Sequence, residues 1–190
     1  MRFLMSREEN IDMNTEVKAQ LQIRSEEWEK VLAAIDAFAL PGYSEIPDVG
    51  LFLEQTSRYI CSVLDPLYSF SLTGSMISNY VKKKLIANPV KKMYGREQIA
   101  YLFFITVAKS VLSLEDIQTM LELQKNTYEP ERAYEYFRSE LKNFLLYVFA
   151  LRENPELIGS EVSTEKELLR NIIITASHKV YLDSCFRLMR

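Results

Sequence analysis

The segment that decides the fold is residues 72–86, which read Leu72-Thr73-Gly74-Ser75-Met76-Ile77-Ser78-Asn79-Tyr80-Val81-Lys82-Lys83-Lys84-Leu85-Ile86. Their spacing predicts a helix that begins at Thr73 or Ser75. At 3.6 residues per turn, one face of this helix is apolar and consists of Met76, Ile77, Tyr80 and Val81. The opposite face is polar and consists of Ser75, Ser78, Asn79, Lys82 and Lys83. We therefore expect a helix that lies on a core and shows hydroxyl, amide and ammonium groups to solvent.

The order of groups along the polar face suits a helix in the major groove of DNA. Short side chains near its N-terminal end can approach base edges, and Asn79 can bond adenine through both groups of its amide. Lys82 and Lys83 follow one turn later and can neutralise phosphates. The small residues at 73–75 leave room for a tight turn in front of the helix. The segment therefore predicts the recognition helix of a helix-turn-helix.

The next ten residues, 87–96, lack helical periodicity, and we expect them to form a short extended excursion. They read Ala87-Asn88-Pro89-Val90-Lys91-Lys92-Met93-Tyr94-Gly95-Arg96. We interpret this excursion as a small two-stranded β wing that Tyr94 anchors. Lys91, Lys92 and Arg96 would then contact phosphate beside the recognition helix.

The charge distribution singles out the same region. The formal net charge of the chain is −3, but residues 66–96 contain six Lys or Arg side chains and no Asp or Glu. A compact positive island on an otherwise acidic chain is typical of one docking face for a polyanion. The alternative is a solvated basic face with no partner.

The remaining sequence predicts further helices. Only 5 Gly and 6 Pro occur in 190 residues, which favours long helices over a many-stranded sheet. Apolar periodicity predicts helices over about 25–40, 48–64, 97–110, 130–152 and 164–190, and one from Leu114 that includes Ile117, Met120 and Leu121. The first twenty residues are expected to form a loosely held arm. Ser113 is expected to cap one helix, and Pro130 suits the first turn of another. The expected fold class is all-α, a helical bundle with a helix-turn-helix and a small β wing.

A family resemblance agrees with this interpretation. The succession Met76-Ile77-x-x-Tyr80, Leu85-Ile86, Lys92-x-Tyr94, Ile99-x-x-Leu102 and Ser113-Leu114-x-x-Ile117 resembles the winged helix-turn-helix of the mercuric-resistance (MerR) regulators. Ile46-Pro47-Asp48, Leu51-Phe52-x-x-Gln55 and Pro89-Val90-Lys91-Lys92 are similar to an uncharacterised bacterial family whose members are described as transcriptional regulators. The sequence departs from the MerR pattern at Ser78, where an arginine is usual, and at Lys84, where a glycine is usual.

The resemblance spans residues 44–125 and implies a division of the chain. Residues 1–43 would be an N-terminal helical arm, 44–125 a winged helix-turn-helix domain, and 126–190 a C-terminal helical region that dimerises. The implied function is a DNA-binding transcriptional regulator whose partner is double-stranded DNA. The alternative is a non-catalytic protein–protein interaction module with a degenerate helix-turn-helix, which the serine at position 78 favours.

No pattern in the sequence indicates catalysis, a cofactor or a metal. His178 is the only histidine, and we expect it to be a packed or surface residue. Cys61 and Cys185 lie far apart and are expected to be free thiols rather than a disulfide. No phosphate-binding glycine loop or zinc-ligand spacing occurs.

Location and assembly follow from composition. No apolar run approaches the roughly 18 residues of a membrane span, so we expect a cytoplasmic protein with no membrane partner. The C-terminal half has more aromatic side chains than one amphipathic helix pair needs. This excess favours a homodimer over an apolar ligand pocket, because helix-turn-helix proteins engage two half-sites. The sequence does not indicate a small-molecule effector.

Overall fold

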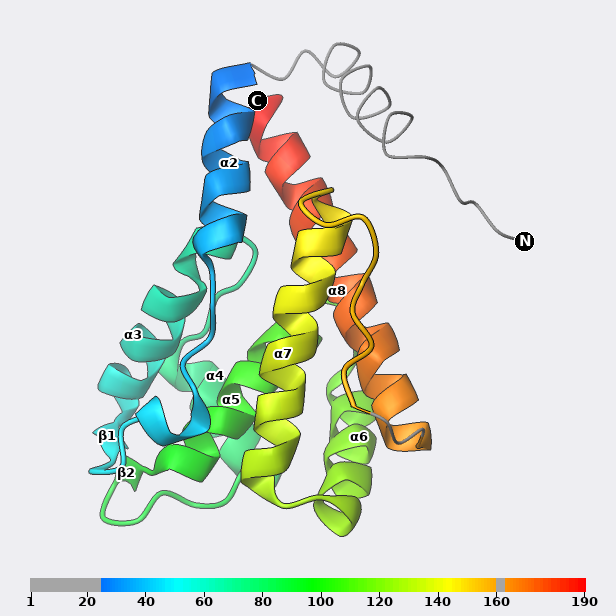
Figure 1. The fold of residues 1–190 in the computed structure, drawn as a ribbon. Coiled ribbons are helices and arrows are strands. Elements are labelled where there is room, and N and C mark those ends of the chain that lie inside the picture. Colours follow the sequence, from blue (N-terminus) through cyan, green and yellow to red (C-terminus); the bar gives the residue numbers. More distant parts are fainter. Residues whose placement is uncertain (1–24, 160–162) are drawn as a thin grey trace.

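A computed structural model describes residues 25–159 and 163–190, and these residues are mostly helical with one small two-stranded antiparallel sheet (Figure 1). The predicted arm over the first twenty residues lies outside the described residues. In chain order the elements are α2 (Ser25–Ala37), η1 (Tyr43–Glu45), β1 (Leu51–Phe52), α3 (Leu53–Leu64), η2 (Asp65–Leu67), α4 (Gly74–Lys82), β2 (Met93–Tyr94), α5 (Arg96–Ala108), α6 (Leu114–Thr127), α7 (Pro130–Val148) and α8 (Thr164–Leu188).

The helix starts that the sequence predicts are confirmed where a capping residue marks them. The Ser113 hydroxyl accepts the Asp116 N–H at 3.1 Å and begins α6. Pro130 is the first residue of α7, where its missing N–H leaves no bond unmade. The predicted end of α7 is wrong by about four residues. The helix ends at Val148 because Ala150 adopts a left-handed φ of 56°.

The helix predicted from about residue 48 begins later, at Leu53. Gly50 interrupts it with a φ of 75°, and the Gln55 side chain accepts the Phe52 N–H at 2.9 Å, which caps α3. Residues 51–52 form a strand instead, with Leu51 opposite Tyr94 and Phe52 opposite Met93. The sheet therefore joins a segment before α3 to the predicted wing, whereas the sequence placed both strands within residues 87–96.

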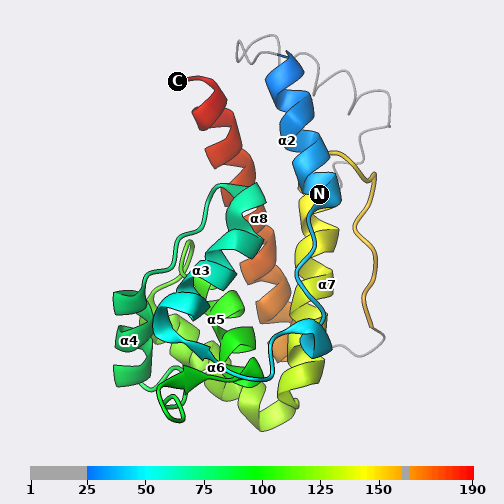
Figure 2. The same ribbon diagram turned by 90° about the vertical axis from the view of Figure 1, so that its left-hand side faces the viewer.

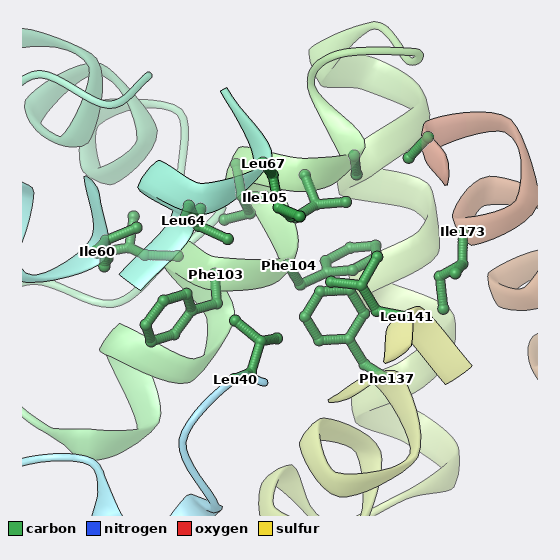
Figure 3. Close-up of a cluster of buried hydrophobic side chains, with 14 of the residues drawn as sticks. Leu40, Ile60, Leu64, Leu67, Phe103, Phe104, Ile105, Phe137, Leu141 and Ile173 are labelled. Carbon is green, nitrogen blue, oxygen red and sulfur yellow. The ribbon is translucent and has the colours of Figure 1, made fainter. Parts of the chain in front are cut away.

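The core surrounds α5, which is buried on nearly every side (Figure 3). Figure 3 shows apolar side chains of α3, α7 and α8 packed around Phe103 and Phe104 of α5. They include Ile60, Leu64, Phe137, Leu141 and Ile173. Phe104 and Phe137 meet edge to face with ring centroids 5.6 Å apart. The central position that the apolar run of residues 97–110 predicts is confirmed.

Aromatic rings join α2 to the last two helices. Trp28 lies on Phe149 with centroids 5.9 Å apart, and it meets the Tyr181 ring edge-on at 5.5 Å. Most aromatic residues of the C-terminal half are thus core residues, as expected from their spacing. Phe186 and Tyr147 are the exceptions, since both are exposed.

An ion pair between a buried carboxylate on α7 and the partly exposed guanidinium of Arg170 on α8 joins the two helices. The Glu140 side chain is 0% exposed, and its Oε1 lies 3.3 Å from Nε of Arg170. The contact is an ion pair without hydrogen-bond geometry, because this oxygen accepts no hydrogen bond from the described residues. Asn143, one turn along α7, donates to Glu140 Oε2 at 3.4 Å and to the Glu156 carbonyl at 2.9 Å.

Three smaller expectations concern single residues and membrane spans. Cys61 and Cys185 are free thiols, and burial raises the pKa of Cys185. His178 is exposed on α8. Within the described ranges, no helix combines the length and the apolar character that crossing a membrane requires.

Candidate nucleic-acid interface

The polar segment 74–82 is a short helix at the outer edge of the molecule, where it packs on α3 (Figure 2). Thr73 caps it, since its Oγ1 accepts the Met76 N–H at 3.3 Å. Ile77 and Tyr80 are buried, and Met76 and Val81 are partly buried against the core. The apolar face that the sequence predicts for this helix is confirmed.

The turn between α3 and α4 is held to α3. The Leu72 carbonyl accepts the Ser57 hydroxyl at 2.7 Å and the Cys61 thiol at 3.3 Å. Gly74 then begins α4 in close contact with the start of α3. A Cβ on Gly74 would lie 2.6 Å from Glu54 Oε1 and 3.2 Å from Leu53 Cδ2. The exposed Glu54 side chain can move aside, so the contact with Leu53 is the one that a larger residue at position 74 would compress.

Replacing Gly74 with valine should lower the free energy of unfolding by about 1–3 kcal/mol, because overpacking displaces neighbouring atoms. Urea denaturation of the two proteins measures the difference. Ser71→Val is the control, since Ser71 lies three residues earlier in the same connection and is exposed. Equal stability of Gly74→Val and the parent would mean that Leu53 can move aside without lowering the free energy of unfolding.

The five predicted recognition residues lie together on the exposed face of α4; they are Ser75, Ser78, Asn79, Lys82 and Lys83. The Ser78 hydroxyl donates to the Gly74 carbonyl at 2.9 Å, so its proton is used within the helix while its oxygen remains an acceptor. In the part of the chain that the structure describes, neither lysine of this face forms an ion pair. The face thus offers an amide, hydroxyls and two unneutralised charges.

The wing is a tight turn that leads into β2. Val90 and Met93 exchange both backbone hydrogen bonds, at 2.9 and 3.0 Å. Lys91 and Lys92 form the turn between them and are exposed. Tyr94 is buried, which agrees with its expected role as an anchor.

Arg96 lies apart from these lysines and bonds within the protein. Its Nε donates to the Ile46 carbonyl at 3.0 Å and its Nη2 to the Ser44 carbonyl at 3.2 Å. Its Nη1 lies 3.8 Å from Asp48 Oδ1, and the guanidinium lies 5.8 Å from the centroid of the Tyr43 ring. Arg96 therefore fixes the start of α5 to the segment before β1, and its donors point to that segment.

Lys84 adjoins the same surface, and the sequence did not select it as a site residue. It is exposed and has a φ of 61°, directly after α4. Its N–H bonds the Val81 carbonyl at 2.9 Å, and the Leu85 N–H bonds the Tyr80 carbonyl at 3.0 Å. This is the Schellman arrangement, in which the left-handed residue is usually glycine. In the sequence, the sign of this unusual position is that lysine stands where the MerR pattern has glycine.

Lys91 and Lys92 share this backbone conformation, with φ values of 49° and 67°. A two-residue hairpin turn with both central residues at positive φ is of type I′, for which Asn-Gly is preferred. A left-handed φ costs a residue with a Cβ about 1 kcal/mol or more relative to glycine. Lys84, Lys91 and Lys92 thus occupy positions at which glycine or asparagine would make the folded protein more stable.

The fold and these exposed groups together define a class: a mostly helical protein that presents a short basic helix, followed along the chain by a lysine-tipped β turn. The chain belongs to the family described as a domain of unknown function (DUF1836), whose model matches residues 41–137. This membership confirms the expectation of an uncharacterised family. No curated protein and no solved structure matches the chain.

Proposed function

We propose that this protein binds double-stranded DNA through α4 and regulates transcription in the cytoplasm. The observation that carries the proposal is the exposed face of α4, which joins a capped N-terminal end with hydroxyl and amide groups to lysines at its C-terminal end. Residues 66–96 contain no carboxylate side chain, and Glu54 of α3 is the carboxylate that lies next to Gly74 at the start of α4. The α3–turn–α4 pair and the β turn after it also agree with the resemblance to MerR regulators.

The residues divide by what they would contact. Ser75, Ser78 and Asn79 lie where they would meet base edges, and Lys82 and Lys83 would meet phosphates on the flank of the groove. Lys91 and Lys92 would reach the backbone from the wing. Arg96 is assigned a positioning role in place of the phosphate contact expected from sequence, because its guanidinium bonds the segment before β1.

A Lys82→Ala/Lys83→Ala variant should bind duplex DNA roughly 30- to 100-fold more weakly at about 0.1 M salt, because two counterion-releasing contacts are lost. The slope of log K against log salt should become shallower by about 1.8. Fluorescence anisotropy with a pool of bacterial promoter fragments, over a series of salt concentrations, measures both quantities.

The matched control is Lys30→Ala/Lys179→Ala, which removes two lysines from α2 and α8, away from α4 (Figure 2). This variant should keep the parent affinity and slope. The proposal is wrong if the parent protein shows no salt-dependent binding to the promoter pool, or if both double variants lose affinity equally.

The second candidate function is a protein-docking module. Two observations favour it: the Ser78 hydroxyl bonds its own helix, and Val49 and Val90 next to the small sheet are 84% and 72% exposed. Apolar groups at this position suit a protein surface better than a phosphate backbone. A parent protein that binds no DNA would favour this candidate.

A homodimer belongs to the same DNA-binding proposal, because two copies would engage two half-sites. Its support is an exposed apolar row at the C-terminal end of α8 that consists of Leu182, Phe186 and the C-cap residue Met189. These residues lie four and then three positions apart, so they share one face of the helix.

A further inference from the structure

Left-handed backbone conformations concentrate in the predicted interface. In the described part of the chain, five residues other than glycine have a positive φ: Tyr68, Lys84, Lys91, Lys92 and Ala150. Three of the five are lysines, and all three lie between α4 and β2. Glycine adopts this conformation readily because it lacks a Cβ, and asparagine can hydrogen-bond its local backbone there, whereas lysine has neither advantage.

Neither backbone motif needs a lysine. α7 ends with the same pair of hydrogen bonds as α4, since the Ala150 N–H bonds the Tyr147 carbonyl at 3.0 Å and the Leu151 N–H bonds the Leu146 carbonyl at 2.8 Å. There the left-handed residue is uncharged Ala150, the counterpart of Lys84. The turn at the wing would likewise form better with Asn-Gly in place of Lys91-Lys92.

The charges are also unfavourable within the isolated protein. All three lysines are exposed, and none forms an ion pair with the residues that the structure describes. The stretch around them, residues 66–96, supplies no carboxylate and carries six positive side chains. Backbone strain and like charge thus both oppose lysine at these positions. A polyanionic partner would reverse the second effect.

We infer that Lys84, Lys91 and Lys92 are phosphate-contact residues, and that lysine at these left-handed positions lowers the stability of the free protein while it strengthens binding to the DNA backbone. The inference rests on the proposed function. It adds Lys84 to the interface. It also states that Lys91 and Lys92 lower the stability of the free protein, for which a solvated basic face without a partner offers no reason.

Three single variants separate strain from charge. Lys84→Gly removes both, Lys84→Gln removes the charge and keeps the strain, and Ala150→Gly removes strain at the far end of α7 without changing charge (Figure 1). Thermal unfolding and salt-dependent anisotropy with the promoter pool are measured for each variant. A fourth variant, Lys91→Asn/Lys92→Gly, applies the same test to the wing.

Lys84→Gly should raise Tm by about 2–4 °C and weaken DNA binding about five- to tenfold at about 0.1 M salt, with a slope shallower by about 0.9. Lys84→Gln should weaken binding equally and raise Tm by less than Lys84→Gly does, because the left-handed backbone strain remains. Ala150→Gly should raise Tm and leave binding unchanged. The wing variant should raise Tm and lose about twice the slope of Lys84→Gly.

Two results would overturn the inference while the proposed function stands. One is a Lys84→Gly protein that binds DNA as the parent does, and the other is a Lys84→Gly protein whose Tm does not rise. A parent protein without salt-dependent DNA binding contradicts the proposed function itself, and the phosphate role of the three lysines with it.

Discussion

Replacing Arg170 with methionine should lower the free energy of unfolding by about 3–5 kcal/mol, the usual effect of removing one partner from a buried ion pair. The Glu140 carboxylate is 0% exposed and lies 3.3 Å from Arg170 Nε. Burial and this carboxylate together raise the pKa of the neighbouring Tyr136. Without the guanidinium, a buried negative charge would remain between α7 and α8 without its ion-pair partner.

Urea denaturation monitored by circular dichroism measures this loss. A Glu140→Leu/Arg170→Met protein should recover most of the stability, because replacing a whole buried pair with apolar groups is often neutral. Lys179→Met removes a partner from the more exposed pair with Asp183 on the same helix, and it should cost about 1 kcal/mol or less. A loss no larger for Arg170→Met than for Lys179→Met would contradict the argument.

The sequence predicted the parts of the fold that local chemistry determines. Apolar spacing gives the inward face of α4, and a hydroxyl at Thr73 or Ser113 marks a helix start wherever the next turn has free N–H groups. These signals lie within a few residues of the structure that they specify. Contacts between segments distant in the chain have no such signal. The pairing of β1 with β2 spans about forty residues, and the sequence predicted a helix over β1.

The same distinction applies to the candidate site. The exposed face of α4 follows from periodicity alone, so its five residues are where the sequence placed them. In the sequence Arg96 is simply one more basic residue. The structure shows that its guanidinium donates hydrogen bonds to the carbonyls of Ile46 and Ser44. The sequence marks Lys84 only as a departure from the MerR glycine, and the structure adds that its φ of 61° makes the position unusual for lysine.

Tyr80 is the side chain that anchors the candidate recognition helix in the core, and truncating it should have an effect as large as that of Arg170. The ring is buried under α4, and Tyr80→Ala should lower the free energy of unfolding by about 3–5 kcal/mol through lost burial and a cavity. The lost anchor lies directly behind the exposed row of Ser75 to Lys83. DNA affinity should therefore fall even though no polar residue has changed.

Tyr80→Phe is the matched control and separates the ring from its hydroxyl. The hydroxyl is buried, accepts and donates no hydrogen bond within the described residues, and has a pKa that burial raises. Removing an unsatisfied buried hydroxyl should leave stability unchanged or raise it by about 1 kcal/mol. DNA binding by Tyr80→Phe should match that of the parent. A Tyr80→Phe protein destabilised by as much as Tyr80→Ala would show that the hydroxyl, rather than the ring, holds α4 in place.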